Sequence, residues 1–134
     1  MSPLVYVVDD DSAVRGGLVR MLKSAGINAE SFASAEEFLE APRRQADTCL
    51  ILDLRLPGSS GIELQRELAA AGSDLPIVFL SAHSTARRRE AAMAAGAVAF
   101  LAKPVDERAL LEAIKTGLAG AVGTNAGGEQ RRNP

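Results

Sequence analysis

The sequence predicts a three-layer α/β sandwich with a parallel central sheet, because three features of its 134 residues agree. Short, continuous apolar runs recur along the chain, as expected of strands that are covered on both faces. Segments with apolar residues at helical spacing separate these runs. Four of the five runs stop at a polar residue with possible phosphate chemistry. If the strands are parallel, those residues share the sheet edge at which ligands bind in open α/β folds.

The five predicted strands differ in polarity, which indicates their places in the sheet. Four runs are almost wholly apolar and are expected at the centre, whereas a shorter and more polar run suits a position nearer an edge. The central runs are 4–8, 48–52, 77–80 and 97–102, and the edge run is 28–32. These runs alternate with helices, so the strands are expected to be joined by right-handed crossovers.

Capping signals mark the ends of the predicted helices. Asp11 or Ser12 can cap the first helix, and Gly26 can close it. Ser34 and Glu37 have the spacing of a capping box at the start of the second helix. The boundaries therefore support the alternation of strand and helix.

A chain of this length forms one domain, which can bury about two-thirds of its unfolded surface. We place this domain at residues 1–120. Residues 121–134, in which Gly, Thr, Asn, Gln and Arg are frequent, are expected to form a flexible tail or a truncated linker to an absent output domain.

Composition and charge exclude several classes of function. The formal net charge of −2 offers no broad basic field, so no direct nucleic acid binding by this chain is expected. There is neither a long apolar stretch nor a basic-then-apolar leader, which predicts a cytoplasmic protein without a membrane span. The single cysteine, Cys49, lies within an apolar run and is expected to be a small buried hydrophobe in a reducing compartment.

Acidic residues at two predicted strand ends form a candidate metal site. Asp9 and Asp10 follow the first strand and Asp53 follows the third, so the fold would bring three carboxylates into one crevice. Like charges at close range destabilise the folded state unless a cation lies between them. Mg²⁺ or Mn²⁺, which favour oxygen ligands, are the natural candidates. Taken singly, the acidic residues Asp9 to Asp11 could instead form a turn and a helix cap, and Asp53 could cap a turn.

Asp53 could also act as a phosphoacceptor, because a carboxylate can attack phosphorus to form an aspartyl phosphate. Lys103 and Ser81 follow two other strands. A lysine ammonium can pair with phosphoryl oxygens, and a hydroxyl can donate one hydrogen bond to them. Taken alone, Lys103 could be a solvated surface lysine, and Ser81 could be part of a turn at the end of a strand. Their matching positions at the ends of strands favour a shared phosphate site.

Together these motifs resemble the receiver domains of bacterial two-component response regulators, the CheY-like family. The resemblance covers about residues 3–118 and rests on Val7-Val8-Asp9-Asp10-Asp11, Asp53-Leu54-Arg55-Leu56-Pro57-Gly58-Ser59-Ser60-Gly61, Ser81-Ala82-His83 and Lys103-Pro104. It implies a flavodoxin-like (βα)5 fold with the strand order 2-1-3-4-5. Segments 34–39 and 94–97 are most similar to FixJ-type receivers, which usually precede a helix-turn-helix domain.

The resemblance implies roles for the site residues. Asp53 would be the phosphoacceptor, with Ser81 as the switch hydroxyl and Lys103 as the phosphate-binding lysine. The implied metal ligands are Asp9, Asp10, Asp53 and the backbone carbonyl of Arg55.

Three further residues lie in motifs of the family. Phe100 matches the aromatic switch position, although an ordinary core phenylalanine would fit the same pattern. The bond between Lys103 and Pro104 corresponds to a cis bond in the family, whereas the general preference of X-Pro bonds favours trans. His83 could be a surface histidine, or it could modulate the lifetime of the phosphoryl group from the rim of the pocket.

The resemblance also implies a partner, a sensor histidine kinase, and an output in the control of transcription. The chain would not be a turnover enzyme, since it would catalyse only its own phosphorylation and dephosphorylation at Asp53. The run Arg87-Arg88-Arg89 is either a solvated helix face or part of a phosphorylation-dependent homodimer surface made by the fourth helix, fifth strand and fifth helix.

Two other classes remain open on the residues alone. An Mg²⁺-dependent phosphohydrolase also uses a nucleophilic aspartate, but it usually has an acid two residues later, where this chain has Arg55. A flavin-binding or structural α/β module could share the architecture. The sequence has no Gly-rich phosphate loop to support that second class.

Overall fold

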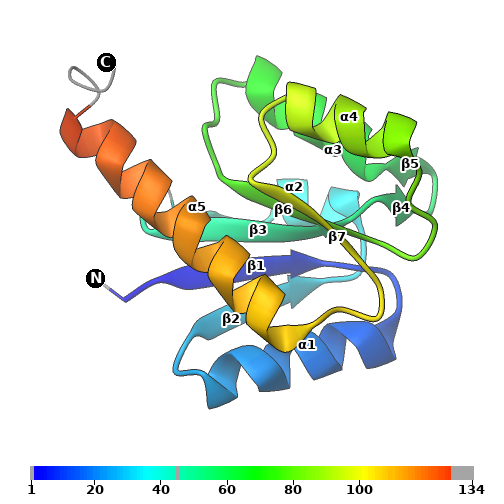
Figure 1. The fold of residues 1–134 in the computed structure, drawn as a ribbon, viewed down its shortest axis with the longest axis horizontal. Coiled ribbons are helices and arrows are strands. Elements are labelled where there is room, and N and C mark those ends of the chain that lie inside the picture. Colours follow the sequence, from blue (N-terminus) through cyan, green and yellow to red (C-terminus); the bar gives the residue numbers. More distant parts are fainter. Residues whose placement is uncertain (1, 45, 128–134) are drawn as a thin grey trace.

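The protein folds as an open parallel sheet between two layers of helices (Figure 1), in a computed structural model that describes residues 2–44 and 46–127. The sheet has the order β2-β1-β3-β6-β7. Its strands are β1 (Leu4–Val8), β2 (Asn28–Phe32), β3 (Thr48–Asp53), β6 (Ile77–Ser81) and β7 (Ala99–Ala102). This confirms the predicted order 2-1-3-4-5 of the five sheet strands. The numbering differs because β4 (Arg55–Leu56) and β5 (Ser59–Ser60) form a separate antiparallel pair, which was not predicted.

Helices cover both faces of the sheet, as predicted. Helices α1 (Ser12–Ser24) and α5 (Glu107–Gly127) lie on one face, and α2 (Ala35–Glu40), α3 (Gly61–Ala70) and α4 (Ala86–Ala94) lie on the other (Figure 1). Successive strand residues point to opposite faces. In β1, for example, Val7 packs in the core beneath α1 and α5, whereas Val8 packs in the core beneath α2, α3 and α4.

Burial along the strands explains their apolar and polar patterns. Every residue of β3 and β6 is buried, because helices cover both sides of these central strands. No residue of β2 is buried, in keeping with its predicted place at an edge. Strand β7 begins at Ala99 rather than at Ala97, because the N–H of Ala97 donates to the carbonyl of Ala92 and completes the turn after α4.

The caps explain where the first helices begin and end. The Asp11 side chain, rather than Ser12, caps α1 by accepting from two backbone N–H groups, and Gly26 follows α1 with φ of 80°. The Ser34 hydroxyl accepts from the N–H of Glu37, as predicted, but the Glu37 carboxylate accepts from Ala33 instead of from Ser34. The predicted capping box is therefore only half formed.

Helix α5 continues to Gly127, so the predicted domain boundary at residue 120 falls within the helix. Alanine is the strongest helix former, and it recurs in this segment among the glycines that suggested a tail. The remainder of the predicted tail, residues 128–134, lies outside the described residues. Among the helices that the structure describes, none has the length and apolar character needed to cross a membrane.

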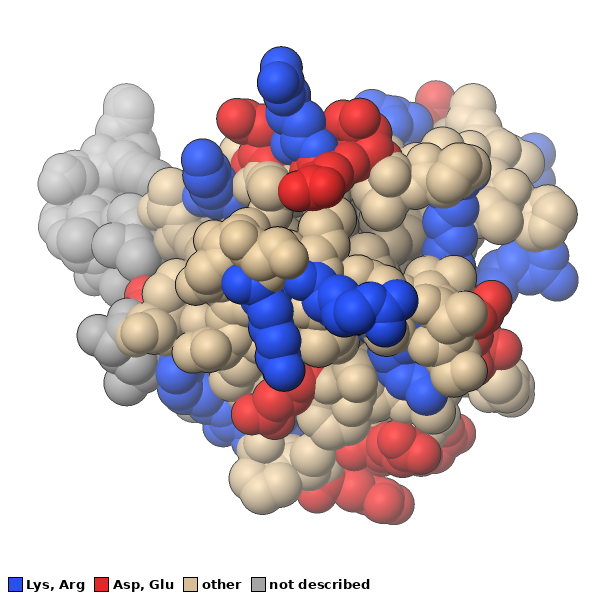
Figure 2. Space-filling view, turned by 90° about the horizontal axis from the view of Figure 1, so that it is seen from below, with Lys and Arg blue, Asp and Glu red and all other residues tan. Residues whose placement is uncertain are grey.

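Charges of both signs are interspersed on the face that carries α1 (Figure 2). This face has no broad basic field of the kind that binds nucleic acid. The thiol of Cys49 is fully buried in β3, and this burial raises its pKa to about 12. Cys49 is thus a small core residue, as predicted.

Candidate functional site

The register of the parallel strands aligns the predicted site residues at one edge. Val8 pairs with Leu52, Asp53 pairs with Leu80, and Ser81 pairs with Ala102. Asp9, Asp53, Ser81 and Lys103 each follow or end one of these strands at its carboxyl end. Residues that are far apart in the sequence therefore reach one pocket, as expected at the ligand-binding edge of an open α/β sheet.

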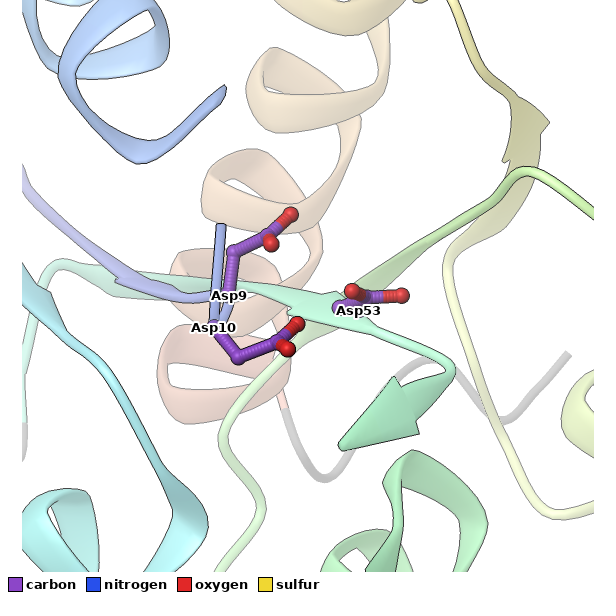
Figure 3. A group of neighbouring side chains, drawn as sticks. All are labelled: Asp9, Asp10 and Asp53. Atoms are coloured by element: carbon purple, nitrogen blue, oxygen red, sulfur yellow. The ribbon is translucent and has the colours of Figure 1, made fainter. Parts of the chain in front are cut away.

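Three carboxylates converge at the ends of β1 and β3 (Figure 3). One oxygen from each of Asp9, Asp10 and Asp53 lies within 4.8 Å of the others. Asp9 and Asp53 are buried, whereas Asp10 is exposed at the rim. Local hydrogen bonds orient the buried pair: Asp9 Oδ1 accepts from the N–H of Asp11 over 2.9 Å, and Asp53 Oδ1 accepts from the N–H of Arg55 over 3.2 Å.

Lys103 bridges the two buried carboxylates. Its Nζ atom lies 3.0 Å from Asp9 Oδ2 and 3.2 Å from Asp53 Oδ2. Burial alone would lower the pKa of Lys103, but its hydrogen bonds and charge interactions with Asp9 and Asp53 raise that pKa above the ordinary value. The ammonium therefore remains charged near neutral pH and can attract an anionic group to Asp53.

The pKa of Asp53 is raised above its ordinary value, chiefly by burial. The N–H of Arg55 opposes this shift, the nearby charge of Asp9 adds to it, and Lys103 opposes it. The folded environment therefore disfavours the ionised form of Asp53, which is the form that could act as a nucleophile.

The acidic cluster is chemically suited to a hard divalent cation. Three carboxylates face one ammonium, so their formal charges of −3 and +1 leave the cluster at −2. Carboxylate oxygens are ligands that Mg²⁺ and Mn²⁺ accept. Arg55 follows Asp53 by two residues and lines the same hollow, which places its backbone near the cluster. The three carboxylates of Asp9, Asp10 and Asp53 thus fit a divalent ion, and the Arg55 carbonyl stays a predicted fourth ligand.

A hollow of about 370 Å³ opens above Asp53. It is lined by Asp10, Asp53, Arg55, Leu56, Pro57, Ala82, His83 and Lys103. The β4–β5 pair forms one side of it, since Arg55 and Leu56 belong to β4. The hollow gives a small anionic ligand access to the carboxylate of Asp53.

Ser81 and His83 bring the end of β6 and the loop after it to the site. The Ser81 side chain is buried, and its Oγ atom accepts from the N–H of His83 over 3.1 Å. The exposed His83 side chain lies at the rim of the hollow, where it was predicted. The carbonyl of Ser81 also accepts from the N–H of Lys103, which ties the ends of β6 and β7 together.

Phe100 lies within β7, and Pro104 lies just beyond its end. The Phe100 ring is buried, with its centroid 6.2 Å from that of Phe79. The Lys103–Pro104 bond is cis, so the general expectation of a trans bond is wrong and the resemblance gave the correct isomer. The two isomers of an X-Pro bond differ by only about 0.5–1 kcal/mol, a difference that surrounding structure can outweigh.

Gly61 is a site residue to which the sequence assigned no role. A Cβ atom at this position would lie 2.7 Å from the backbone oxygen of Asp53 and 2.9 Å from Cε1 of Phe79. The N–H of Gly61 donates to the Leu54 carbonyl over 2.7 Å. Helix α3 therefore begins in direct contact with the backbone that carries Asp53. In the sequence, only the place of Gly61 in the motif that begins with Asp53 pointed to this contact.

Comparisons with known proteins agree with the fold and the pocket. Residues 5–115 match the response regulator receiver domain family. The response regulator protein TodT of Pseudomonas putida is 43% identical over 115 residues, which cover 86% of this chain and 51% of TodT. The transcriptional regulatory protein FixJ of Azorhizobium caulinodans is 38% identical over 114 residues, which cover 85% of this chain and 54% of FixJ. The solved structure of the response regulator StyR matches with a TM-score of 0.85 and 47% identity, covering 98% of this chain and 66% of that one.

The fold and the site define a parallel α/β domain with an acidic pocket at one edge of its sheet, and the comparisons give its family. The chain belongs to the response regulator receiver domain family. FixJ is among its relatives, as the sequence motifs indicated. The chain spans about half the length of the curated relatives TodT and FixJ. The phosphohydrolase alternative gains no support, and Arg55 stands where such an enzyme usually has its second acid.

Proposed function

We propose that this chain receives a phosphoryl group on Asp53 from a sensor histidine kinase and transmits that event as a change of its surface. The observation that carries this proposal is the convergence of Asp53, Lys103 and two further carboxylates at one sheet edge. Catalysis by such a site consists mainly of positioning and electrostatic stabilisation. The chain acts on itself and is not a turnover enzyme.

Mg²⁺ or Mn²⁺ would be held by Asp9, Asp10, Asp53 and the Arg55 carbonyl. When bound, such an ion neutralises charge on the phosphoryl donor. The protein's own groups orient the reaction. The N–H of Arg55 fixes one oxygen of Asp53, and Lys103 holds the other at 3.2 Å.

Ser81 and Lys103 are the proposed partners of the transferred phosphoryl group. Before transfer, the Ser81 hydroxyl accepts from His83 and the lysine pairs with two carboxylates. A phosphoryl group would offer both residues new acceptor oxygens. The hydrogen bond from the N–H of Lys103 to the Ser81 carbonyl would couple the movements of these two residues to β7, which carries the ring of Phe100. Phosphorylation would then shift the population between two packings of this region.

The output is proposed to be transcription in the cytoplasm, through a DNA-binding domain that lies outside this chain. The support is the chain's relationship to FixJ, a transcriptional regulatory protein, of which it covers only 54%. His83 is proposed to tune the lifetime of the phosphoryl group from the rim of the hollow.

A phosphorylation-dependent homodimer through α4, β7 and α5 is a further part of the proposal. Its motivation is the arginine run of α4 together with the acidic residues Asp106, Glu107 and Glu112 at the start of α5. Opposite charges on two copies of a chain can pair across a twofold interface. Sedimentation velocity with and without a phosphoryl mimic tests this idea, and identical sedimentation in both conditions would count against it.

Incubation with acetyl phosphate and Mg²⁺, followed by intact mass measurement, tests the phosphoacceptor role. We expect one acid-stable, alkali-labile phosphoryl addition to the parent chain and none to Asp53→Asn. Equal labelling of the two proteins would refute the role of Asp53. Labelling of the parent should also disappear when the divalent ion is removed with a chelator.

A further inference from the structure

Helix α4 is attached to the protein mainly by polar contacts. Of its nine residues, only Ala92 is buried, whereas α3 buries four residues. The side chain of alanine contributes little apolar surface to a core. Hydrogen bonds from charged or buried side chains therefore decide where α4 lies against the sheet.

The C-terminal half of α4 is anchored to α3. The Nε2 atom of buried Gln65 donates to the Ala92 carbonyl over 3.2 Å. That carbonyl also accepts from the N–H of Ala97. The other amide atom, Gln65 Oε1, has no hydrogen-bond partner among the described residues. The Ala92 methyl group and the hydrogen bond from Gln65 fix the C-terminal end of α4, which lies farther from Asp53.

Two arginines attach the N-terminal half of α4. Arg88 Nη1 donates to the carbonyl of His83 over 2.7 Å, and Arg89 Nη1 donates to the carbonyl of Phe100 over 3.1 Å. These carbonyls lie in the two segments that bring side chains to Asp53. The first segment begins with Ser81 and the second ends at Lys103.

We propose that Arg88 and Arg89 are positioning residues of the phosphorylation site. Each holds the backbone of one segment that supplies a phosphate partner. The position of α4 and the geometry of the pocket would then change together, in one equilibrium between two arrangements. This inference rests on the proposed function of Asp53 and gives the arginine run of α4 a role within the chain. The proposal includes that phosphorylation moves these two segments and breaks both hydrogen bonds, so that the bonds stabilise only the unphosphorylated arrangement.

Hydrogen exchange of the unphosphorylated chain tests the attachment without any phosphate chemistry. We expect the amides of α4 to exchange about two- to five-fold faster in Arg88→Gln and Arg89→Gln, since each loses one partly exposed charged hydrogen bond. Arg87→Gln is the matched control. It removes the same charge from the same helix, and among the described residues Arg87 makes no hydrogen bond or ion pair. Arg89→Lys, which keeps a cationic donor, should restore part of the protection.

The rate of labelling by acetyl phosphate and Mg²⁺ tests the coupling to the pocket. Loss of either arginine bond should raise this rate about two- to five-fold over the parent and Arg87→Gln, because the competing arrangement becomes more populated. Unchanged exchange in both variants would overturn the proposal, and so would faster exchange with an unchanged labelling rate. A parent chain that takes no label would refute the proposed function of Asp53 itself, and the positioning role with it.

Discussion

Replacing Gly61 by alanine should damage the site through its backbone. The new Cβ atom would lie 2.7 Å from the Asp53 oxygen, 2.9 Å from Phe79 Cε1 and 3.1 Å from Leu54 Cα. Two of these three atoms belong to the backbone and the third to the buried ring of Phe79, so none is the free end of a flexible side chain that could move aside. Overpacking of this kind costs about 1–3 kcal/mol. The reduced freedom of the unfolded chain returns about 0.4–1 kcal/mol, which leaves a net loss of about 0–2.6 kcal/mol, centred slightly above 1 kcal/mol.

Urea unfolding followed by circular dichroism measures this loss, with Gly16→Ala as the matched control. Gly16 lies inside α1, where the nearest atom to a new Cβ is Arg20 Nη1 at 3.4 Å, the end of a flexible side chain. Alanine there should stabilise the protein by about 0.5–1 kcal/mol through its helix propensity. If Gly61→Ala proved as stable as Gly16→Ala, the close approach of α3 to Asp53 would be refuted. We also expect slower labelling of folded Gly61→Ala by acetyl phosphate, and parent-like labelling of Gly16→Ala.

Three further outcomes follow from charge and burial. The folded-state pKa of Asp53 is raised, so the folded protein binds this proton more tightly than the unfolded chain and loses stability as the carboxyl ionises. The stability of Asp53→Asn relative to the parent should therefore increase from about pH 4 to pH 7 in urea unfolding, and a constant difference would contradict the shift. Lys103→Met removes the ammonium that competes with a divalent ion, so Mg²⁺ affinity measured by calorimetry should rise roughly ten-fold, whereas weaker binding would contradict the competition. The buried Cys49 thiol, with a pKa of about 12, should react with a thiol reagent at least about a hundred-fold more slowly in the native protein than in denaturant, and equal rates would disprove its burial.

The sequence predicted the parts of the fold that depend on hydrophobic pattern and strand ends. A continuous apolar run specifies a strand covered on both faces, and parallel pairing then brings its carboxyl end beside those of its neighbours. This reasoning placed Asp53 beside Asp9 although 43 positions separate them in the chain. It placed Lys103 at the same edge for the same reason.

Features that depend on tertiary contacts were missed. The β4–β5 pair is only two residues on each side and has no apolar alternation to reveal it. The roles of Gly61, Gln65, Arg88 and Arg89 depend on contacts with other elements, which no local pattern encodes. The sequence indicated a solvated face for the run of arginines, and all three residues are exposed, but it gave no sign that Arg88 and Arg89 donate to backbone carbonyls of other segments.

Mg²⁺ binding to single carboxylate variants tests the central claim most directly. Calorimetry should show weaker binding for Asp9→Asn, Asp10→Asn and Asp53→Asn, because each removes one charge from a cluster whose oxygens lie within 4.8 Å of one another. Exposed Asp74, at the opposite end of the sheet, should tolerate the same substitution without effect. Binding that responds equally to all four substitutions, or to none of them, would contradict a shared divalent-ion site.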